Sequence, residues 1–118
     1  MSRTDSAAAG EKNLQRVCFV LKVRKDRLAE YKERHAAVWP EMRAALRAAG
    51  WHNYSLFSDE EGTVIGYLET EDFDRARAAM AESEVNARRQ AEMAPLFENL
   101  PGRPDEGMVP LTEIFHLA

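Results

Sequence analysis

The chain has 118 residues, 45% of them hydrophobic and 31% charged, with a formal net charge of −4. This length accommodates one domain with one modest core, and the weakly acidic balance gives no electrostatic case for nucleic acid or an anionic membrane. We therefore expect a neutral small molecule or another protein as the partner.

The N-terminal residues 1–13 are rich in Ser, Ala, Gly and charge, without apolar periodicity. Such a segment buries too little surface to offset its ordering entropy, so we predict a disordered tail followed by a single domain over residues 14–118. It lacks the apolar segment of a signal peptide, and no stretch approaches the ~18 consecutive apolar residues of a membrane span. The expected location is the cytoplasm.

Residues 16–23 alternate in a way that predicts a strand with one strongly apolar face. That face would carry Val17, Phe19, Leu21 and Val23. The single cysteine, Cys18, lies in this run and cannot form an internal disulfide. A buried strand residue in a reducing compartment is favoured over a nucleophile.

A long amphipathic helix is predicted next, capped by Asp26 and continuing with apolar residues at three- and four-residue spacing to Gly50. Pro40 should bend it, because the ring disturbs the preceding turn. Tyr31 and His35 stand four residues apart on the apolar stripe. Both side chains must therefore face the sheet.

The remaining elements complete an α+β pattern. Residues 53–58 and 63–70 predict an antiparallel hairpin, Asp72 caps a second helical region, a further helical piece runs from about residue 85 to 97, and residues 109–117 predict a last strand. The order β-α-β-β-α-β is the ferredoxin-like arrangement, a four-stranded antiparallel sheet with helices on one face. Apolar side chains on both faces of several strands predict a homodimer whose sheets pack face to face.

The candidate chemistry centres on Tyr31 and His35. An inward histidine is often only hydrogen-bonded to a backbone carbonyl, and an inward tyrosine often only packs its ring. Aromatic faces and polar tips together suit a sugar, since rings stack on the C–H face of a pyranose while imidazole and phenol reach its hydroxyls. Further side chains of this kind that could converge with the pair are Trp39, Trp51, His52 and Tyr54.

Other chemistries lack their motifs. His35, His52 and His116 are far apart in sequence, without HExxH or paired cysteines, so no metal is expected. A Gly-rich phosphate loop, a G-x-S-x-G elbow and a dinucleotide fingerprint are all missing, so no nucleotide cofactor is expected either.

Residues 30–42, EYKERHAAVWPEM, resemble the L-rhamnose mutarotase family, as do residues 52–57 (HNYSLF), 85–88 and 113–116. The likeness covers roughly residues 16–117. It implies a cofactor-free isomerase that interconverts the α and β anomers of L-rhamnose, built as a dimeric ferredoxin-like α+β barrel. In that family the histidine matching His35 is the proton donor, and the tyrosines matching Tyr31 and Tyr54 help to bind the sugar.

One departure concerns the helical segment after Arg88. The family commonly has tryptophan there, whereas this chain reads Arg89-Gln90. Both are carried as substrate-binding candidates, with Trp39 as a pocket wall, because a guanidinium plane can stack and donate hydrogen bonds. Alternatively, Arg89 lies on a solvated face. The departure bears on the identity of the sugar, and no residue stands out as the general base.

Other functions stay open on the sequence. The chain could act on a related deoxysugar, or it could be a cofactor-independent monooxygenase or lactone isomerase on the same barrel. It could also be a binding barrel without catalysis, with His35 as a satisfied core residue. In that last case His35→Ala would cost stability and change no activity.

Overall fold

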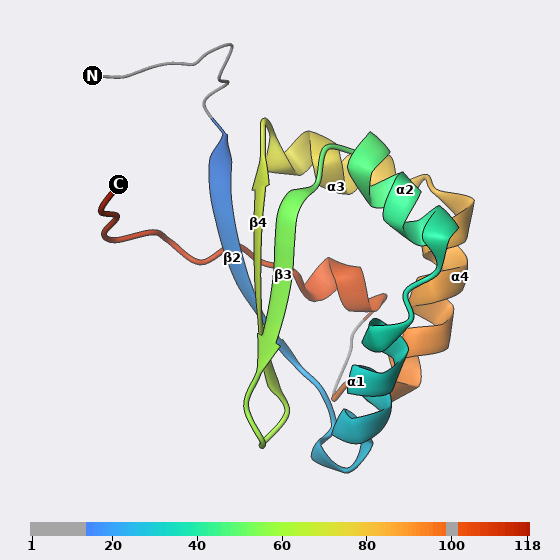
Figure 1. Cartoon of the computed structure of the whole chain (residues 1–118). Coiled ribbons are helices and arrows are strands. Elements are labelled where there is room, and N and C mark those ends of the chain that lie inside the picture. Colours follow the sequence, from blue (N-terminus) through green and yellow to red (C-terminus); the bar gives the residue numbers. More distant parts are fainter. Residues whose placement is uncertain (1–13, 99–101) are drawn as a thin grey trace.

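The computed structural model describes residues 14–98 and 102–118. The predicted tail, residues 1–13, lies outside them. Figure 1 shows two layers, with the sheet on one side and α1, α2 and α4 packed across from it. In chain order the elements are β2 (Gln15–Lys22), η1 (Lys25–Arg27), α1 (Leu28–Ala36), α2 (Pro40–Ala48), β3 (His52–Ser58), β4 (Thr63–Thr70), α3 (Phe73–Ala81), α4 (Glu84–Met93), η2 (Ala94–Leu96) and η3 (Pro104–Gly107).

The sheet is antiparallel in the order β2-β4-β3, so the predicted hairpin is confirmed and β4 is the central strand. Successive side chains of a strand point to opposite faces of the sheet, so the alternation of apolar residues determines which face is buried. The apolar face predicted for the first strand is buried, and every second residue of β4 is buried against it. Phe19 lies opposite Gly66, and its fully buried ring occupies the space that a side chain at residue 66 would need.

The predicted long helix is two helices. Ala37, with φ −137° and ψ 57°, ends α1, and Trp39 is extended before Pro40 opens α2. Pro40 therefore starts a helix instead of bending one, because its missing N–H is not needed at the first helical position. Asp26 does not cap α1; it lies in η1 and accepts a hydrogen bond from Arg24 at 3.3 Å. Asp72 caps α3 as predicted, through the Arg75 N–H.

The fourth strand of the prediction is not formed. Among the described residues the sheet has three strands. The segment after residue 108 meets β2 at the Phe19–Pro110 bridge, at the Leu111 N–H bond to the Cys18 carbonyl, 2.7 Å, and at an ion pair between Arg16 and Glu113, which do not amount to a strand pairing. It then runs past β2, away from the helices (Figure 1). Its apolar side chains are largely exposed in the single chain; Ile114 is 93% exposed and Phe115 79% exposed.

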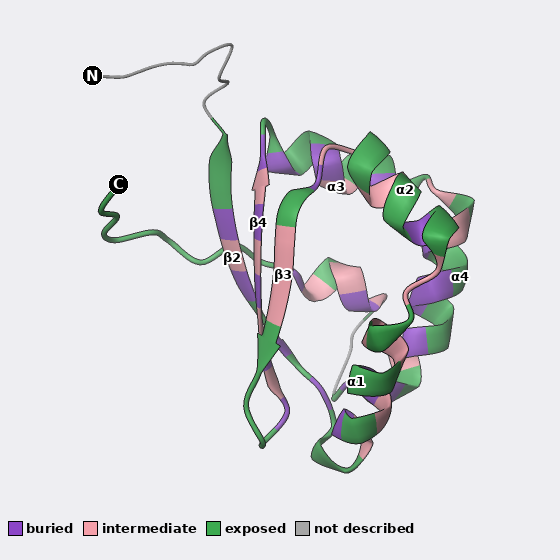
Figure 2. Ribbon diagram, in the orientation of Figure 1, coloured by how far each residue is buried: buried purple, intermediate pink, exposed green. Residues whose placement is uncertain are grey.

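The outer face of the sheet is uncovered by helices (Figure 2). Cys18 projects to this side and is half-buried, not buried as expected, since its strand neighbours Val17 and Phe19 take the inner face. Val20 and Phe57 are exposed there too. In the described residues, no helix has the length and apolarity to span a membrane.

Candidate active site

A cavity of about 810 Å³ lies between the sheet and the helical layer. Its walls come from α1, α2, α4, β3 and the η3 turn, and its size is in the range of small-molecule sites. Most of the lining is apolar. The polar side chains that matter for the argument below are Tyr31, His35, Tyr54, Arg89, Gln90 and Asp105.

Tyr31 and His35 form a stacked pair inside this cavity, as their four-residue spacing predicts. The ring centroids are 4.3 Å apart at an interplanar angle of 41°. His35 Nδ1 lies 2.9 Å from the Tyr31 carbonyl oxygen. Because a carbonyl only accepts, Nδ1 carries the proton, and Nε2 is the nitrogen left for proton transfer.

Burial shifts the pKa of the imidazole and the pKa values of the two cavity tyrosines in opposite directions. Burial lowers the pKa of His35, the bond to the Tyr31 carbonyl opposes this, and the Arg89 charge lowers the pKa further. Burial raises the pKa of Tyr31 to about 12. Burial also raises the pKa of Tyr54, with Tyr31 and Asp105 adding to the effect. At neutral pH both tyrosines are therefore neutral hydroxyls, and the imidazole is the group that exchanges protons.

A bulge in β3 turns Tyr54 inward together with Trp51. The pairing with β4 shifts between His52 and Ser55, where Asn53 has a φ of 48°. Asn tolerates this left-handed conformation better than most residues. In a regular strand, the side chains of residues three positions apart point to opposite faces. The ring centroids of Trp51 and Tyr54 are nevertheless only 5.0 Å apart. His52 is exposed and does not join the site.

Arg89 lies inside the molecule, not on a solvated face. The residue is 5% exposed and lines the cavity. The guanidinium donates to the Arg34 carbonyl at 3.2 Å and lies 5.5 Å from the centre of the Trp39 ring. Trp39 therefore packs against the Arg89 guanidinium and does not itself line the cavity. Among the described residues it is Trp51 that provides an indole to the cavity lining.

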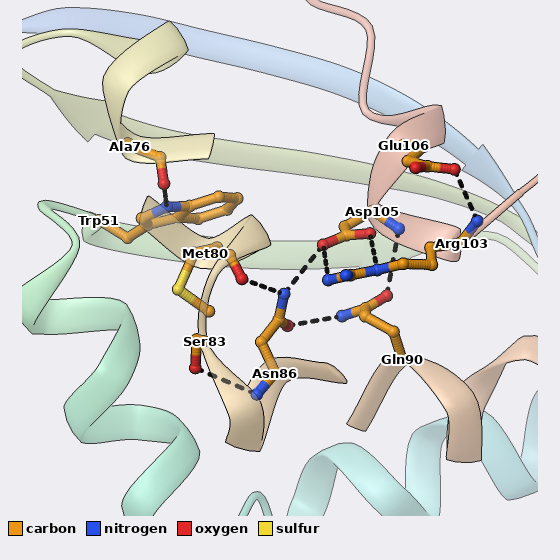
Figure 3. A network of polar contacts seen from close by, with 9 residues as sticks. All are labelled: Trp51, Ala76, Met80, Ser83, Asn86, Gln90, Arg103, Asp105 and Glu106. Atoms are coloured by element: carbon orange, nitrogen blue, oxygen red, sulfur yellow. Dashed lines mark hydrogen bonds and ion pairs between the residues drawn. The ribbon is translucent and has the colours of Figure 1, made fainter. Parts of the chain in front are cut away.

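Gln90 is also buried, and it belongs to a polar network that sequence reasoning missed (Figure 3). The network joins α4 to the η3 turn through Asn86 and Asp105. A Pro-Asp pair in a loop is ordinary turn chemistry, so the sequence gives no signal for the role of Asp105. In the described part of the chain, no group of three or more His, Cys, Asp or Glu side chains could hold a metal ion.

The comparison with known proteins decides the family. The sequence model described as L-rhamnose mutarotase matches residues 16–117. The chain belongs to the L-rhamnose mutarotase family. The resemblance carried by the R-H-x-x-V-W-P-E segment is therefore confirmed, and the family is one of isomerases that act on sugar anomers.

Individual relatives agree with this assignment. L-rhamnose mutarotase of Bacillus subtilis (strain 168) is 45% identical over 86 residues, which cover 72% of this chain and 82% of that protein. L-rhamnose mutarotase of Shouchella clausii (strain KSM-K16) is 40% identical over 108 residues, covering 87% and 98%. The crystal structure of L-rhamnose mutarotase from Formosa agariphila matches with a TM-score of 0.72 at 29% identity, covering 88% of this chain and 99% of that one.

The two positions at which the sequence is expected to depart from the family pattern, Arg89 and Gln90, both reach the cavity, together with Tyr31, His35 and Tyr54. A cation and an amide therefore line its α4 side, and Trp51 adds an aromatic surface.

Proposed function

We propose that this chain is an L-rhamnose mutarotase that interconverts the α and β anomers of L-rhamnopyranose. The observation that carries the proposal is the Tyr31–His35 pair in the interior cavity, with the imidazole tautomer fixed by the 2.9 Å contact to the Tyr31 carbonyl. Relatives 40–45% identical to this chain carry the name L-rhamnose mutarotase.

In this proposal His35 is the proton donor. Protonated at Nε2, it gives its proton to the ring oxygen as the C1–O5 bond breaks, while the anomeric hydroxyl loses its proton and becomes the aldehyde oxygen. Rotation about C1–C2 presents the other carbonyl face, and the reverse steps close the opposite anomer. An imidazole suits this exchange because its pKa lies near neutrality.

Tyr31 and Tyr54 are the proposed sugar-binding hydroxyls. Burial keeps both protonated, so each can donate to a sugar oxygen at any working pH. Arg89 and Gln90 are proposed to contact the sugar from α4, and Trp39 acts through Arg89. Because a guanidinium differs from an indole in what it stacks on and donates to, a related deoxysugar is the second candidate substrate.

The proposal includes a cytoplasmic homodimer. Apolar side chains on the outer face of the sheet and after residue 110 are exposed in the single chain, among them Phe57, Leu111, Ile114, Phe115 and Leu117. A second copy packed sheet to sheet would cover this surface. Within such a dimer residues 109–117 would have a surface to pack on and would complete a four-stranded sheet.

Saturation-transfer NMR tests the activity and the substrate together. L-rhamnose, L-fucose and D-glucose are compared with and without the wild-type protein, by irradiating one anomeric proton and observing the other. We expect fast exchange for L-rhamnose and little enhancement for D-glucose. Enhancement for L-fucose alone would assign a related deoxysugar, and no enhancement for any sugar by the folded protein would overturn the proposal.

A further inference from the structure

Ring opening needs an acceptor for the proton of the anomeric hydroxyl as well as a donor for the ring oxygen. We infer that Asp105 is this acceptor and that Gln90 and Asn86 hold it in place. The inference rests on the proposed function. Of the described residues that line the cavity, Asp105 is the only one with a carboxylate.

Hydrogen bonds fix the orientation of this carboxylate. Asn86 Nδ2 donates to Oδ2 at 3.0 Å, and Arg103 donates to the same oxygen through Nη2 at 3.0 Å. Oδ1 receives only a longer bond, 3.3 Å, from Arg103 Nε. Oδ1 therefore has lone-pair capacity for a further donor, which a sugar hydroxyl can supply.

Asp105 lines the same cavity as the proposed sugar-binding hydroxyls, Tyr31 and Tyr54. Burial is the main cause of the raised pKa of Tyr54, and the charge of Asp105 adds to it. Tyr31 is in turn stacked on His35. Asp105 comes from η3 and His35 from α1, so donor and acceptor reach the cavity from separate elements.

Gln90 and Asn86 close a ring of hydrogen bonds with Asp105 (Figure 3). The Asp105 backbone N–H donates to Gln90 Oε1 at 3.1 Å, and Gln90 Nε2 donates to Asn86 Oδ1 at 2.9 Å. Asn86 Nδ2, besides its bond to Asp105, donates to the Met80 carbonyl at 2.9 Å. In each of the two side-chain amides the oxygen accepts a hydrogen bond and the nitrogen donates one, and this fixes which end is the oxygen. Gln90 is thus a positioning residue, a role that an indole at this position could not take.

The proton balance of the step closes. Asp105 Oδ1 takes the proton from O1 as the C1–O1 bond becomes a carbonyl, and the electron pair of the breaking C1–O5 bond takes the proton of His35 Nε2. On reclosure the O5 hydroxyl returns its proton to His35, and Asp105 returns its proton to O1. Both residues end in their starting state, and no co-reactant is consumed.

Kinetics of Asp105→Asn and Asp105→Ala test the inference, with L-rhamnose anomer exchange as the readout. General base catalysis predicts that kcat falls by about 10²-fold or more in Asp105→Asn while KM stays within a few-fold. In Asp105→Ala, added formate should restore part of the rate, because it supplies the missing carboxylate. Formate should have no effect on His35→Ala. Glu106→Gln, which removes a carboxylate from the same turn, is the matched control and should keep the wild-type rate.

Gln90→Met separates positioning from binding. It keeps the side-chain volume but loses the bonds to Asp105 and Asn86. Positioning of the base predicts a fall in kcat, smaller than in Asp105→Asn, whereas a sugar contact alone predicts a rise in KM with kcat unchanged. The inference is overturned if folded Asp105→Asn keeps kcat within about three-fold, if its loss lies in KM alone, or if formate fails to raise the rate of Asp105→Ala. An inactive wild-type protein would instead overturn the proposed function itself.

Discussion

His35 Nδ1 lies 2.9 Å from the carbonyl oxygen of Tyr31, one helical turn earlier in α1. The contact ties the imidazole to the backbone of the helix that carries it, so the ring cannot reorient without losing a hydrogen bond worth about 1 kcal/mol. The same spacing stacks the two rings at 4.3 Å. A local sequence pattern thus builds the central pair of the site without help from distant segments.

The titration of His35 should lie below the ordinary imidazole value of ~6.5. Burial disfavours the charged ring, and the Arg89 cation disfavours it further. Arg89→Gln should therefore raise the pKa, because it removes a positive charge that opposes protonation. Since the protonated ring is the proposed donor, kcat/KM should fall as pH rises through this pKa, and that falling limb should move to higher pH in Arg89→Gln.

NMR of the imidazole C–H groups against pH measures this directly. Arg88→Gln is the control. It also removes a cation that lies over the Trp39 ring, but Arg88 does not line the cavity. A His35 midpoint at or above ~6.5, or one that Arg89→Gln leaves in place, would contradict the electrostatic description.

Tyr31→Phe should weaken sugar binding more than it slows the chemical step. The substitution keeps the packing of the ring on His35 and Phe97 and removes only the hydroxyl. Loss of one hydrogen bond predicts a KM about 10-fold higher, with kcat and stability little changed. Tyr67→Phe, which removes a hydroxyl bonded to Glu69 on the other side of the sheet, is the matched control. Equal KM values for the two variants would refute the binding role.

Gly66→Ala should destabilise the fold. A Cβ at residue 66 would lie 2.2 Å from Phe19 Cζ, and the Phe19 ring is fully buried, with no room to move aside. Overpacking of this kind costs about 1–3 kcal/mol in the free energy of unfolding. Thermal denaturation checks it against Gly107→Ala, where the nearest atom would be 3.5 Å away. An unchanged melting temperature in Gly66→Ala would show that the sheet and the ring can relax.

Phe57→Lys should shift the protein from dimer to monomer. Phe57 is 64% exposed on the outer face of β3, and a charge buried in a sheet-to-sheet contact is costly. Sedimentation velocity is the measurement, with Glu60→Lys in the β3–β4 turn as the control for added charge. A wild-type protein that sediments as a monomer at micromolar concentration would remove the homodimer from the proposal.

Much of the fold follows from local patterns. Alternation in residues 16–23 gives the buried face of β2, and the turn at 59–62 gives the hairpin. Two expectations fail for related reasons. Pro40 starts α2 because its effect depends on whether the chain before it can leave the helix, and Ala37 does so. Residues 109–117 have strand composition, yet they meet β2 at an isolated bridge and their apolar side chains stay exposed, so local composition is not enough to form a strand.

Some residues of the candidate site can likewise be predicted from local sequence patterns, and others cannot. The four-residue spacing predicts that Tyr31 and His35 face inward together, and Arg89 and Gln90 are candidates because they stand where the family commonly has tryptophan. Trp39 packs against Arg89 and does not line the cavity wall as expected, because the chain leaves the helix before Pro40. Trp51 does line the cavity, and the bulge at Asn53 turns Tyr54 toward it. Asp105 was missed because it reaches the cavity from a turn 70 residues beyond His35. Such a contact leaves no mark in local periodicity.

The most direct test of the account is anomer exchange of L-rhamnose by saturation-transfer NMR with the wild type and His35→Ala side by side. We predict rapid exchange in the wild type and loss of the enhancement in a His35→Ala variant that retains the wild-type fold by circular dichroism. Exchange at the wild-type rate in His35→Ala would contradict the account, because the proton donor would then have to be another group.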